Sequence, residues 1–547
     1  MLIAWSNARA QASQAAPSTS AAMSHFYGGD AAGAARILEA ITTATPNDAN
    51  AWRLLARCYR QMGELDRATI AYRRAIALEP NAPAALFNLA GVYSLRGNSD
   101  SAFALLAKVK ASHNYDMTQL AVDSAYVSLR HDPRYPSLLP SAADFAASFT
   151  EEVKVIRELD GDSAGDQFGW IARSIGDVDH DGVADFVTSA PTMNIAGANA
   201  GRVSAFSSKG GKLLWSVYGK PGEQLGTGLE SAGDVDADGT EDVIAGAPYS
   251  GRSYVYSGKD GHLLFTLKAE NVSDAFGVHV STAGDVDHDG RADFIVGAPQ
   301  NSAGGKGAGR AYVYSGKDAH VLLTLTGERD GDAFGSTVAG YSDAKRSFVV
   351  VGAPSAGGGK AGRTYVYEGL SKKPTFIIES DSTGQALGAM FVSVAGDVNG
   401  DGVPDVYASD YTNSAKGPST GRIYVHSGKD GERLLTLTGE TAGEGFGIGP
   451  ATAGDVDHDG SADLIVGSWQ YSGAATSGGR VYLYSGRDGH LIRTYTDRIP
   501  GDTFGFDAVG IGDVDGDGTL DFLLTAAWSG VHGNHSGRIF IVSSGVK

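Results

Sequence analysis

The residues best suited to chemistry are aspartates gathered in the nine-residue segment 285–293. Carboxylates occupy its positions 1, 3, 5 and 9, and Gly290 occupies position 6. Four carboxylates this close together repel one another strongly unless a cation lies between them. Because no His or Cys stands at these positions, the pattern favours a hard cation of the calcium type, which prefers oxygen ligands.

The same pattern occurs in five further segments, each with Gly at position 6 and Asp at position 9. Residue types at position 7 vary, which is expected if that position contributes only its backbone carbonyl. The predicted metal ligands, at positions 1, 3, 5, 7 and 9, are Asp177, Asp179, Asp181, Val183, Asp185; Asp234, Asp236, Asp238, Thr240, Asp242; Asp285, Asp287, Asp289, Arg291, Asp293; Asp397, Asn399, Asp401, Val403, Asp405; Asp455, Asp457, Asp459, Ser461, Asp463; and Asp513, Asp515, Asp517, Thr519, Asp521. Asn399 lowers the charge of its loop but keeps an oxygen ligand.

EF-hand and dockerin calcium loops begin in the same way, so the residues that follow must separate the alternatives. An EF-hand needs a bidentate Glu at position 12 and a helix running through it. Here position 12 is Thr188, Ala245, Val296, Ala408, Val466 or Leu524, in largely apolar segments that are typical of strands. The loops are therefore predicted to connect strands. Six acidic turns without metal are the less favoured alternative, because a fourfold acidic pattern repeated six times is uncommon among simple Asp-Gly turns.

The overall charge agrees with bound cations. The 547-residue chain has a formal net charge of -19 and 63 acidic residues, of which 23 are aspartates at the repeated positions of the six loops. Six divalent ions would add +12 and leave -7, which is ordinary for a soluble surface. Nucleic acid is not an expected partner, because no basic stripe is available to meet phosphates. The sequence predicts no transmembrane segment, because no apolar run approaches the roughly 18 residues that span a bilayer.

A helical period with a repeat of 34 residues marks the N-terminal part. Its central copy places Trp52, Leu55, Ala56, Tyr59, Ala68, Tyr72, Ala75 and Pro80 at the repeat positions. This spacing resembles tetratricopeptide repeats over about residues 28–115 and predicts an all-α domain over 28–140. Segment 1–27 is expected to be disordered, the remnant of an export signal or a partial helix, and segment 141–150 to be a linker. The resemblance implies a groove for a protein or peptide, and a role as a structural spacer is an equal alternative.

Residues 151–547 contain seven copies of a second repeat. Each copy has an aromatic residue or leucine followed by glycine, then four strand-like segments: Phe168-Gly169, Leu225-Gly226, Phe276-Gly277, Phe334-Gly335, Leu387-Gly388, Phe446-Gly447 and Phe504-Gly505. Four strands in seven copies predict a seven-bladed β-propeller. These copies resemble FG-GAP repeats, similar to the propeller of integrin α subunits and of related bacterial secreted proteins. The resemblance implies calcium loops between strands 1 and 2 of each blade, with ligands on the opposite face.

Ring closure is predicted from an orphan strand. The last copy ends after its third strand, and segment 153–159 matches the pattern of a fourth strand, so it is expected to complete the seventh blade. Blade four differs from the others, because 339–348 lacks the carboxylates and the loop glycine. About six calcium ions are therefore predicted, with none in blade four, where Lys345 or Arg346 is expected to replace the cation's charge.

Two other repeated features are predicted to be structural. A Gly-Arg pair occurs in all seven copies, at Arg202, Arg252, Arg310, Arg363, Arg422, Arg480 and Arg538. An acid stands two residues before the Phe-Gly or Leu-Gly pair in six copies, at Asp166, Glu223, Asp274, Asp332, Glu444 and Asp502, whereas Gln385 is the exception. Each Arg is expected to bond a nearby acid or carbonyl between neighbouring strands or blades.

No catalytic motif lies in a suitable context. Segment 161–165 matches the nucleophile-elbow string around Ser163, but that elbow must join a strand to a helix. The loops between strands 2 and 3 are the expected ligand surface, with Trp469 and Trp528 either facing a ligand or simply packing.

The sequence thus predicts a calcium-binding, non-catalytic, interaction or adhesion-type protein of the bacterial cell envelope or exterior. Partners are expected at the helical groove, at the propeller face, or at both, where the ligand is a protein or a glycan. The location would be extracellular, periplasmic or cell-surface associated. The alternative is a secreted glycan-active lyase or hydrolase that uses the central funnel of the propeller.

Overall fold

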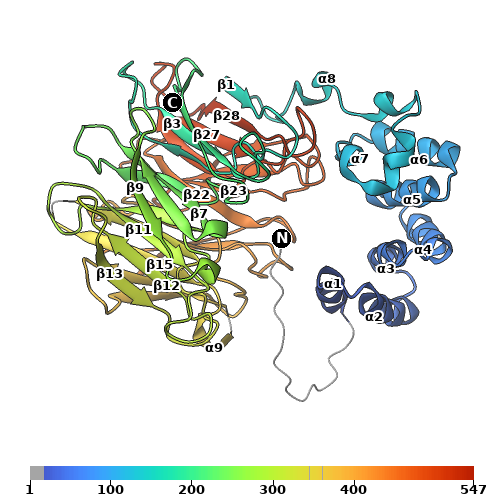
Figure 1. Ribbon diagram of the computed structural model, residues 1–547, viewed down its shortest axis with the longest axis horizontal. Coiled ribbons are helices and arrows are strands. Elements are labelled where there is room, and N and C mark those ends of the chain that lie inside the picture. Colours follow the sequence, from blue (N-terminus) through green and yellow to red (C-terminus); the bar gives the residue numbers. More distant parts are fainter. Residues whose placement is uncertain (1–17, 344, 360) are drawn as a thin grey trace. The chain divides into compact units, whose positions relative to one another are not determined.

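Paired helices build the N-terminal unit of the computed structural model, which describes residues 18–547 except 344 and 360 (Figure 1). This unit ends at Ser141, and a second unit begins at Ala142. Its main helices are α1 (Thr19–Tyr27), α2 (Ala31–Ala44), α3 (Ala49–Gln61), α4 (Leu65–Leu78), α5 (Pro83–Leu95) and α6 (Ser99–Ala111). The short α7 (Gln119–Val122) and the 3-10 turns η1 (Ser124–Leu129) and η2 (Tyr135–Leu138) follow them. None of the helices in the described ranges is long and apolar enough to cross a bilayer.

Local sequence explains where these helices begin. Asp48 caps α3, because its carboxylate accepts a hydrogen bond from the Ala51 N–H at 2.8 Å, and Asp30 caps α2 in the same way through Gly33 at 2.7 Å. The helical region starts at Thr19 rather than at residue 28, because Phe26 of α1 is buried in the same core as α2 and α3. Residues 1–17 of the expected disordered segment lie outside the described residues. The predicted all-α repeat domain is confirmed over 19–111.

Small residues let neighbouring helices approach closely, as the repeat pattern predicts. Ala56, Ala68 and Ala75 are each at most 2% exposed, and Tyr59 and Tyr72 fill the seam between their helices. The array ends against Tyr126 of η1, whose hydroxyl donates to the Phe87 carbonyl of α5. Packing of paired helices, rather than the propensity of any single helix, therefore holds this unit together.

Seven antiparallel sheets of four strands form the second unit, which confirms the predicted propeller (Figure 1). Blades 1 to 3 contain β2 (Ala172–Ser174), β3 (Phe186–Ala190), β4 (Arg202–Phe206), β5 (Leu213–Tyr218); β6 (Leu229–Gly233), β7 (Asp242–Ala247), β8 (Arg252–Tyr256), β9 (Leu263–Lys268); and β10 (Val280–Gly284), β11 (Asp293–Ala298), β12 (Arg310–Tyr314), β13 (Val321–Thr326). Blades 4 and 5 contain β14 (Thr337–Ser342), β15 (Ser347–Ala353), β16 (Arg363–Glu368), β17 (Phe376–Glu379); and β18 (Val392–Val394), β19 (Val406–Asp410), β20 (Arg422–His426), β21 (Arg433–Thr438). Blade 6 contains β22 (Phe446–Gly454), β23 (Asp463–Ser468), β24 (Arg480–Tyr484) and β25 (Leu491–Thr496). The second strand of every blade is buried along its whole length, so the core lies between blades.

The seventh blade closes the ring with a strand from the start of the unit, as predicted. Its strands are β26 (Ala508–Gly512), β27 (Asp521–Ala526), β28 (Arg538–Ser543) and β1 (Val155–Asp160). β1 pairs antiparallel with β28, with Leu159 opposite Ile539, and the two lie side by side in Figure 1. Because β1 covers the outer edge of β28, blade seven has the same four-stranded form as the others.

Glycines at the blade junctions are required by a close approach of two backbones. A Cβ on Gly309 would lie 2.1 Å from the Phe334 carbonyl oxygen, and Gly309 has a φ of +84°. Gly309 and Phe334 form a parallel bridge, and the same bridge joins Gly201 to Leu225 and Gly479 to Phe504. In five of the seven blades, the glycine of the Gly-Arg pair and the aromatic residue or leucine of the Phe-Gly or Leu-Gly pair therefore belong to one junction.

The segment 141–150, predicted as a linker, is packed on the propeller from residue 142 onward. α8 (Ala142–Phe145) begins it, and Phe149 pairs with Asp497 in an isolated bridge. The Phe149 ring lies 5.2 Å from that of Phe504 and 5.3 Å from that of Phe540. Two buried aromatic contacts and backbone hydrogen bonds hold this segment as part of the closing blades.

Candidate metal centres

All six acidic loops connect the first and second strands of their blades. The loop 285–293, for example, joins β10 to β11, and Asp293 is the first residue of β11. The aspartates at position 9 are completely buried in every loop: Asp185, Asp242, Asp293, Asp405, Asp463 and Asp521. A buried carboxylate must be hydrogen-bonded or paired with a cation, so these six residues are the place to examine the site.

In five of the six loops, the position-9 carboxylate ties three backbone segments together, and Asp521 of blade seven is the exception. One Asp293 oxygen accepts from the Val286 N–H at 2.9 Å, and the other accepts from the Gly316 N–H at 2.9 Å in the turn between strands 3 and 4. The same two bonds recur at Asp242, where the donors are Val235 and Gly258. The position-9 side chain therefore builds the loop as well as offering oxygen to an ion.

Burial makes the charged form of these carboxylates costly without a cation. Burial, with a smaller contribution from neighbouring carboxylates such as Asp287 beside Asp293, raises the pKa of Asp242, Asp293, Asp405 and Asp521 to about 6. Backbone N–H donors lower these pKa values, but their effect is smaller than that of burial. A divalent ion would remove this penalty by favouring the ionised form.

The remaining loop carboxylates are oriented by the turn itself. Asp285 accepts from the N–H groups of Asp289 at 3.0 Å and Gly290 at 2.9 Å, and Asp289 accepts from the Arg291 N–H at 3.1 Å. Gly290 has a φ of +89°, a conformation that glycine adopts without strain and that explains the invariant position 6 of the repeats. These bonds hold carboxylates at positions 1 and 5 at fixed points of the loop.

Five loops gather three carboxylates whose oxygen atoms lie within 4.8 Å of one another: Asp177, Asp179 and Asp185; Asp234, Asp236 and Asp242; Asp285, Asp287 and Asp289; Asp455, Asp457 and Asp463; and Asp513, Asp515 and Asp521. The remaining loop, 397–405 in blade five, has the amide Asn399 in the middle of its set, and the Asp401 N–H donates to both Asp397 and Asn399. Position 5 joins the gathered set only in the third blade. The position-7 residues, predicted as carbonyl ligands, donate their N–H to the position-5 carboxylate.

The donor set fits a hard divalent cation. All gathered atoms are carboxylate oxygens, and one oxygen of Asp455 is buried without a hydrogen-bond partner in the described part of the chain. Such an orphaned acceptor is expensive in a folded protein unless an ion satisfies it. Calcium, when bound, would supply the positive charge that these loops otherwise lack.

Blade four replaces the loop by a short turn. Ser342 of β14 pairs with Ser347 of β15, and Asp343 accepts from the N–H groups of Lys345 and Arg346 at 2.7 and 2.8 Å. The one carboxylate of this turn is therefore engaged with the backbone. The expectation of a blade without metal stays a prediction.

The seven Gly-Arg arginines each contact a nearby acid, as expected. Five pair with an acid six residues before the Phe-Gly or Leu-Gly pair: Arg202 with Asp162, Arg310 with Glu270, Arg363 with Glu328, Arg422 with Asp381 and Arg480 with Glu440. Arg252 pairs with Glu223, and Arg538 contacts Glu158, Asp160 and Asp502. The acid at the nearer position usually accepts backbone N–H bonds in the connecting turn, as Asp332 does from Glu328 and Arg329. The acid that recurs six residues before the Phe-Gly or Leu-Gly pair is the sequence signal that could have identified these pairs.

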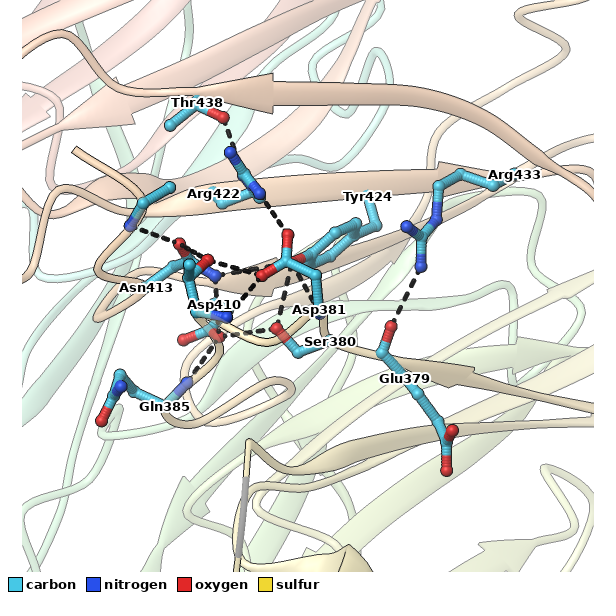
Figure 2. Close-up of polar contacts among 12 residues, drawn as sticks. Glu379, Ser380, Asp381, Gln385, Asp410, Asn413, Arg422, Tyr424, Arg433 and Thr438 are labelled. Carbon is cyan, nitrogen blue, oxygen red and sulfur yellow. Dashed lines mark hydrogen bonds and ion pairs between the residues drawn. The ribbon is translucent and has the colours of Figure 1, made fainter.

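Blade five compensates for the missing acid at Gln385. Asp410, at the end of β19, is fully buried and accepts from the N–H groups of Gln385 at 2.9 Å and Ala386 at 3.1 Å, and from the Ser380 hydroxyl (Figure 2). Arg422 is held beside it by Asp381 and by the Thr438 hydroxyl at 2.8 Å (Figure 2). Asp410 thus performs from the second strand the role that an acid of the connection performs elsewhere.

Substituting Asp410 by alanine is expected to destabilise the propeller by about 1–3 kcal/mol, because buried N–H donors lose their acceptor. Adding Gln385→Glu should recover part of that loss, since it restores the acid found in the other blades. Chemical denaturation of the two variants measures both effects. Gln385→Glu in the wild-type background is the control, and an unaltered midpoint for Asp410→Ala would contradict the assigned role.

Two of the aromatic residues expected at the ligand surface pack against each other instead. The rings of Trp469 and Trp528 lie 5.0 Å apart in an edge-to-face arrangement, and Phe506 contacts both. Tyr249, which lies in the loop between strands 2 and 3 of blade two, is by contrast 56% exposed. Of the two alternatives for the tryptophans, packing is the one that the structure supports.

The central channel, proposed as the funnel of an enzyme, holds a paired set of charges. The first strands of all seven blades line a cavity of about 360 Å³. Arg173 bonds Glu230 at 2.7 Å and also bonds Asp507, so both carboxylates are engaged with one guanidinium. Burial, with a smaller contribution from Arg173, lowers the pKa of His279 to about 4. Ser163 lies in the connection after β1, where its N–H donates to Asp166, and not in a strand-to-helix elbow.

Seven four-stranded blades with carboxylate loops between their first two strands, together with paired helices, define a propeller of the FG-GAP class with a tetratricopeptide array. Comparison with known families agrees: the FG-GAP repeat model matches residues 230–259 and 276–314, an FG-GAP-like repeat model matches 397–466, and a tetratricopeptide repeat model matches 19–83 and 61–116. The chain therefore contains FG-GAP repeats and tetratricopeptide repeats.

Integrin α subunits are among its curated relatives. The chain is 27% identical over 219 residues to integrin alpha-5 of Xenopus laevis, a match that covers 36% of this chain and 21% of the relative. It is 31% identical over 214 residues to integrin alpha pat-2 of Caenorhabditis briggsae, with 32% and 17% covered, and 29% identical over 275 residues to human integrin alpha-E, with 43% and 23% covered. The chain thus spans about a fifth of the length of these relatives.

Proposed function

We propose that this chain is a calcium-stabilised, non-catalytic binding protein of adhesion type. The single observation that carries the proposal is the six acidic loops, of which five gather three carboxylates within 4.8 Å of one another. The resemblance of the propeller to integrin α subunits supports an interaction role, and the tetratricopeptide array supports a protein or peptide partner. The pairing of both channel carboxylates with Arg173 supports a role without catalysis.

The proposed location is the bacterial cell envelope or exterior. Calcium sites of moderate affinity fill only where calcium is plentiful, and that is the case outside the cytoplasm. A propeller that needs these ions for stability would therefore work best in such a compartment. The partner of the propeller is a protein or glycan, and the helical array would hold a second protein or a peptide.

Equilibrium dialysis against calcium tests the metal part of the proposal, with an expected stoichiometry of about six ions per chain. Binding of no calcium at millimolar concentration would refute it. A glycan array and an affinity capture, each with and without calcium, test the binding part. Formation of a glycan product would instead support the glycan-active enzyme named as the alternative above.

Calcium affinity is expected to fall as the pH decreases from about 7 to 5. A proton competes with calcium for the carboxylates of Asp242, Asp293, Asp405 and Asp521, whose pKa values of about 6 exceed the ordinary value of 3.8. Titrations at pH 7.5, 6.5 and 5.5 measure this change. Affinity that does not vary over this range would contradict the position-9 aspartates as ligands.

The metal-free protein should show the opposite trend in stability. A carboxyl group whose pKa is raised in the folded state makes folding more favourable below the raised pKa, and this advantage is lost as the pH rises through about 6. With respect to these four groups, the melting temperature in chelator is therefore expected to be higher at pH 5 than at pH 7.5. In saturating calcium this difference should shrink or reverse.

A further inference from the structure

A basic side chain lies beside most of the acidic loops. In three blades it is a lysine from the turn between strands 3 and 4, close to the position-5 carboxylate: Lys259 lies 3.6 Å from Asp238, Lys317 3.9 Å from Asp289 and Lys429 3.8 Å from Asp401. In blades one and six, Lys209 and Arg487 donate instead to the position-5 backbone carbonyl at 3.0 and 3.3 Å. The side chains of the three lysines are 54–66% exposed, so solvent screens their charges.

Blade seven is built differently. Its fourth strand is β1, so no turn joins strands 3 and 4, and no lysine can come from one. The cation comes instead from Lys154, the residue before β1, whose Nζ lies 2.6 Å from an oxygen of Asp515 and 2.7 Å from an oxygen of Asp517. These are positions 3 and 5 of the loop, so Lys154 bonds two predicted calcium ligands directly.

The backbone of Lys154 is part of the ring closure. Its carbonyl accepts a hydrogen bond from the Ser543 N–H at 3.0 Å, at the end of β28. The missing turn also affects Asp521, since no N–H from such a turn reaches it. One oxygen of this fully buried carboxylate has no hydrogen-bond partner among the described residues. The blade-seven loop therefore holds the ammonium group of Lys154, which the closing strand keeps in place, and a buried oxygen of Asp521 without a hydrogen-bond partner among the described residues.

We infer that Lys154 is a built-in counter-cation that competes with calcium at the blade-seven loop, 513–521. This inference rests on the proposed calcium binding. A calcium ion that takes oxygen from Asp515 must displace or weaken a contact of 2.6 Å. In the other four-carboxylate loops, the neighbouring Lys or Arg lies 3.6 Å or more from the position-5 carboxylate or bonds a backbone carbonyl. The blade-seven loop is accordingly the last of the four-carboxylate loops to fill with calcium. While it is empty of calcium, Lys154 reduces the repulsion between its carboxylates and so supports ring closure.

The test replaces Lys154 with methionine in the full chain, with Lys259→Met as the matched control. Calcium titration by competition with a fluorescent chelator should show that the binding event that Asp513→Asn removes becomes about three- to tenfold tighter in Lys154→Met, the size expected from exposed ion pairs, and changes less in the control. Melting in chelator should show a larger loss of thermal stability for Lys154→Met than for Lys259→Met. In saturating calcium the two variants should melt alike.

Asp513→Asn identifies the site. In that background one binding event should disappear, and Lys154→Met should no longer change calcium affinity. Equal effects of the two lysine variants on calcium affinity, or a blade-seven binding event that Lys154→Met leaves unaltered, would overturn the inference while the proposed function stands. A wild-type chain that binds no calcium would overturn both. If Lys154→Met folds poorly, Lys154→Gln provides the same comparison.

Discussion

Removing calcium is expected to lower the melting temperature of the propeller by more than about 10 °C. One ion at a hundredfold excess over its dissociation constant stabilises the folded state by about 2.7 kcal/mol, and six loops offer such sites. Spread over a unit of this size, each kcal/mol changes the melting temperature by about one to a few degrees. Calorimetry in millimolar calcium and in chelator measures the difference.

The helical unit is an internal control for that experiment, because its residues contain no acidic loop and its unfolding should not respond to chelator. A single loop can be tested with Asp293→Asn. The amide keeps an oxygen acceptor for the Val286 or Gly316 N–H but removes the charge, so the variant should bind one ion fewer. A melting temperature of the propeller that is the same with and without chelator would refute the electrostatic role of calcium.

Replacing Arg538 with methionine should destabilise the propeller by about 3–5 kcal/mol. Arg538 has a side chain that is 2% exposed, and it contacts Glu158, lies 3.2 Å from Asp160 and lies 3.8 Å from Asp502. Loss of the guanidinium removes a buried cation from the seam that closes the ring, where the side chain of Asp502 is only 1% exposed, and a buried carboxylate that loses a cationic neighbour is costly. Denaturant unfolding followed by tryptophan fluorescence measures the change.

Arg363→Met is the matched control for that substitution. Arg363 begins the third strand of blade four as Arg538 begins that of blade seven, but its partners Glu328 and Glu379 have side chains 52% and 60% exposed. Exposed pairs contribute about 0–1 kcal/mol, so this variant should remain close to the wild type. Similar losses for both variants would show that the seam depends on strand pairing alone and not on its buried charges.

Much of this architecture follows from local patterns in the chain. The aspartates at positions 1, 3, 5 and 9, the position-6 glycine and the Phe-Gly pairs recur at nearly constant intervals, and each acts within one turn or one strand. The orphan strand before the first blade indicated the ring closure, because a repeat that ends one strand short needs its partner elsewhere. These patterns predict structure from the sequence because the interactions that they encode join residues close together in the chain.

Side-chain partners outside the repeat pattern could not be predicted in this way. Asp410 replaces the acid missing at Gln385, and Lys154 reaches a loop more than 350 residues away in the chain. Neither follows a repeat, since each depends on which backbones the folded ring brings within hydrogen-bond distance. The docking of Phe149 on Phe504 likewise becomes visible only after β1 has closed the ring. Repeated short-range contacts are therefore determined by the local sequence, whereas contacts outside the repeat pattern are set by the packing of the whole propeller.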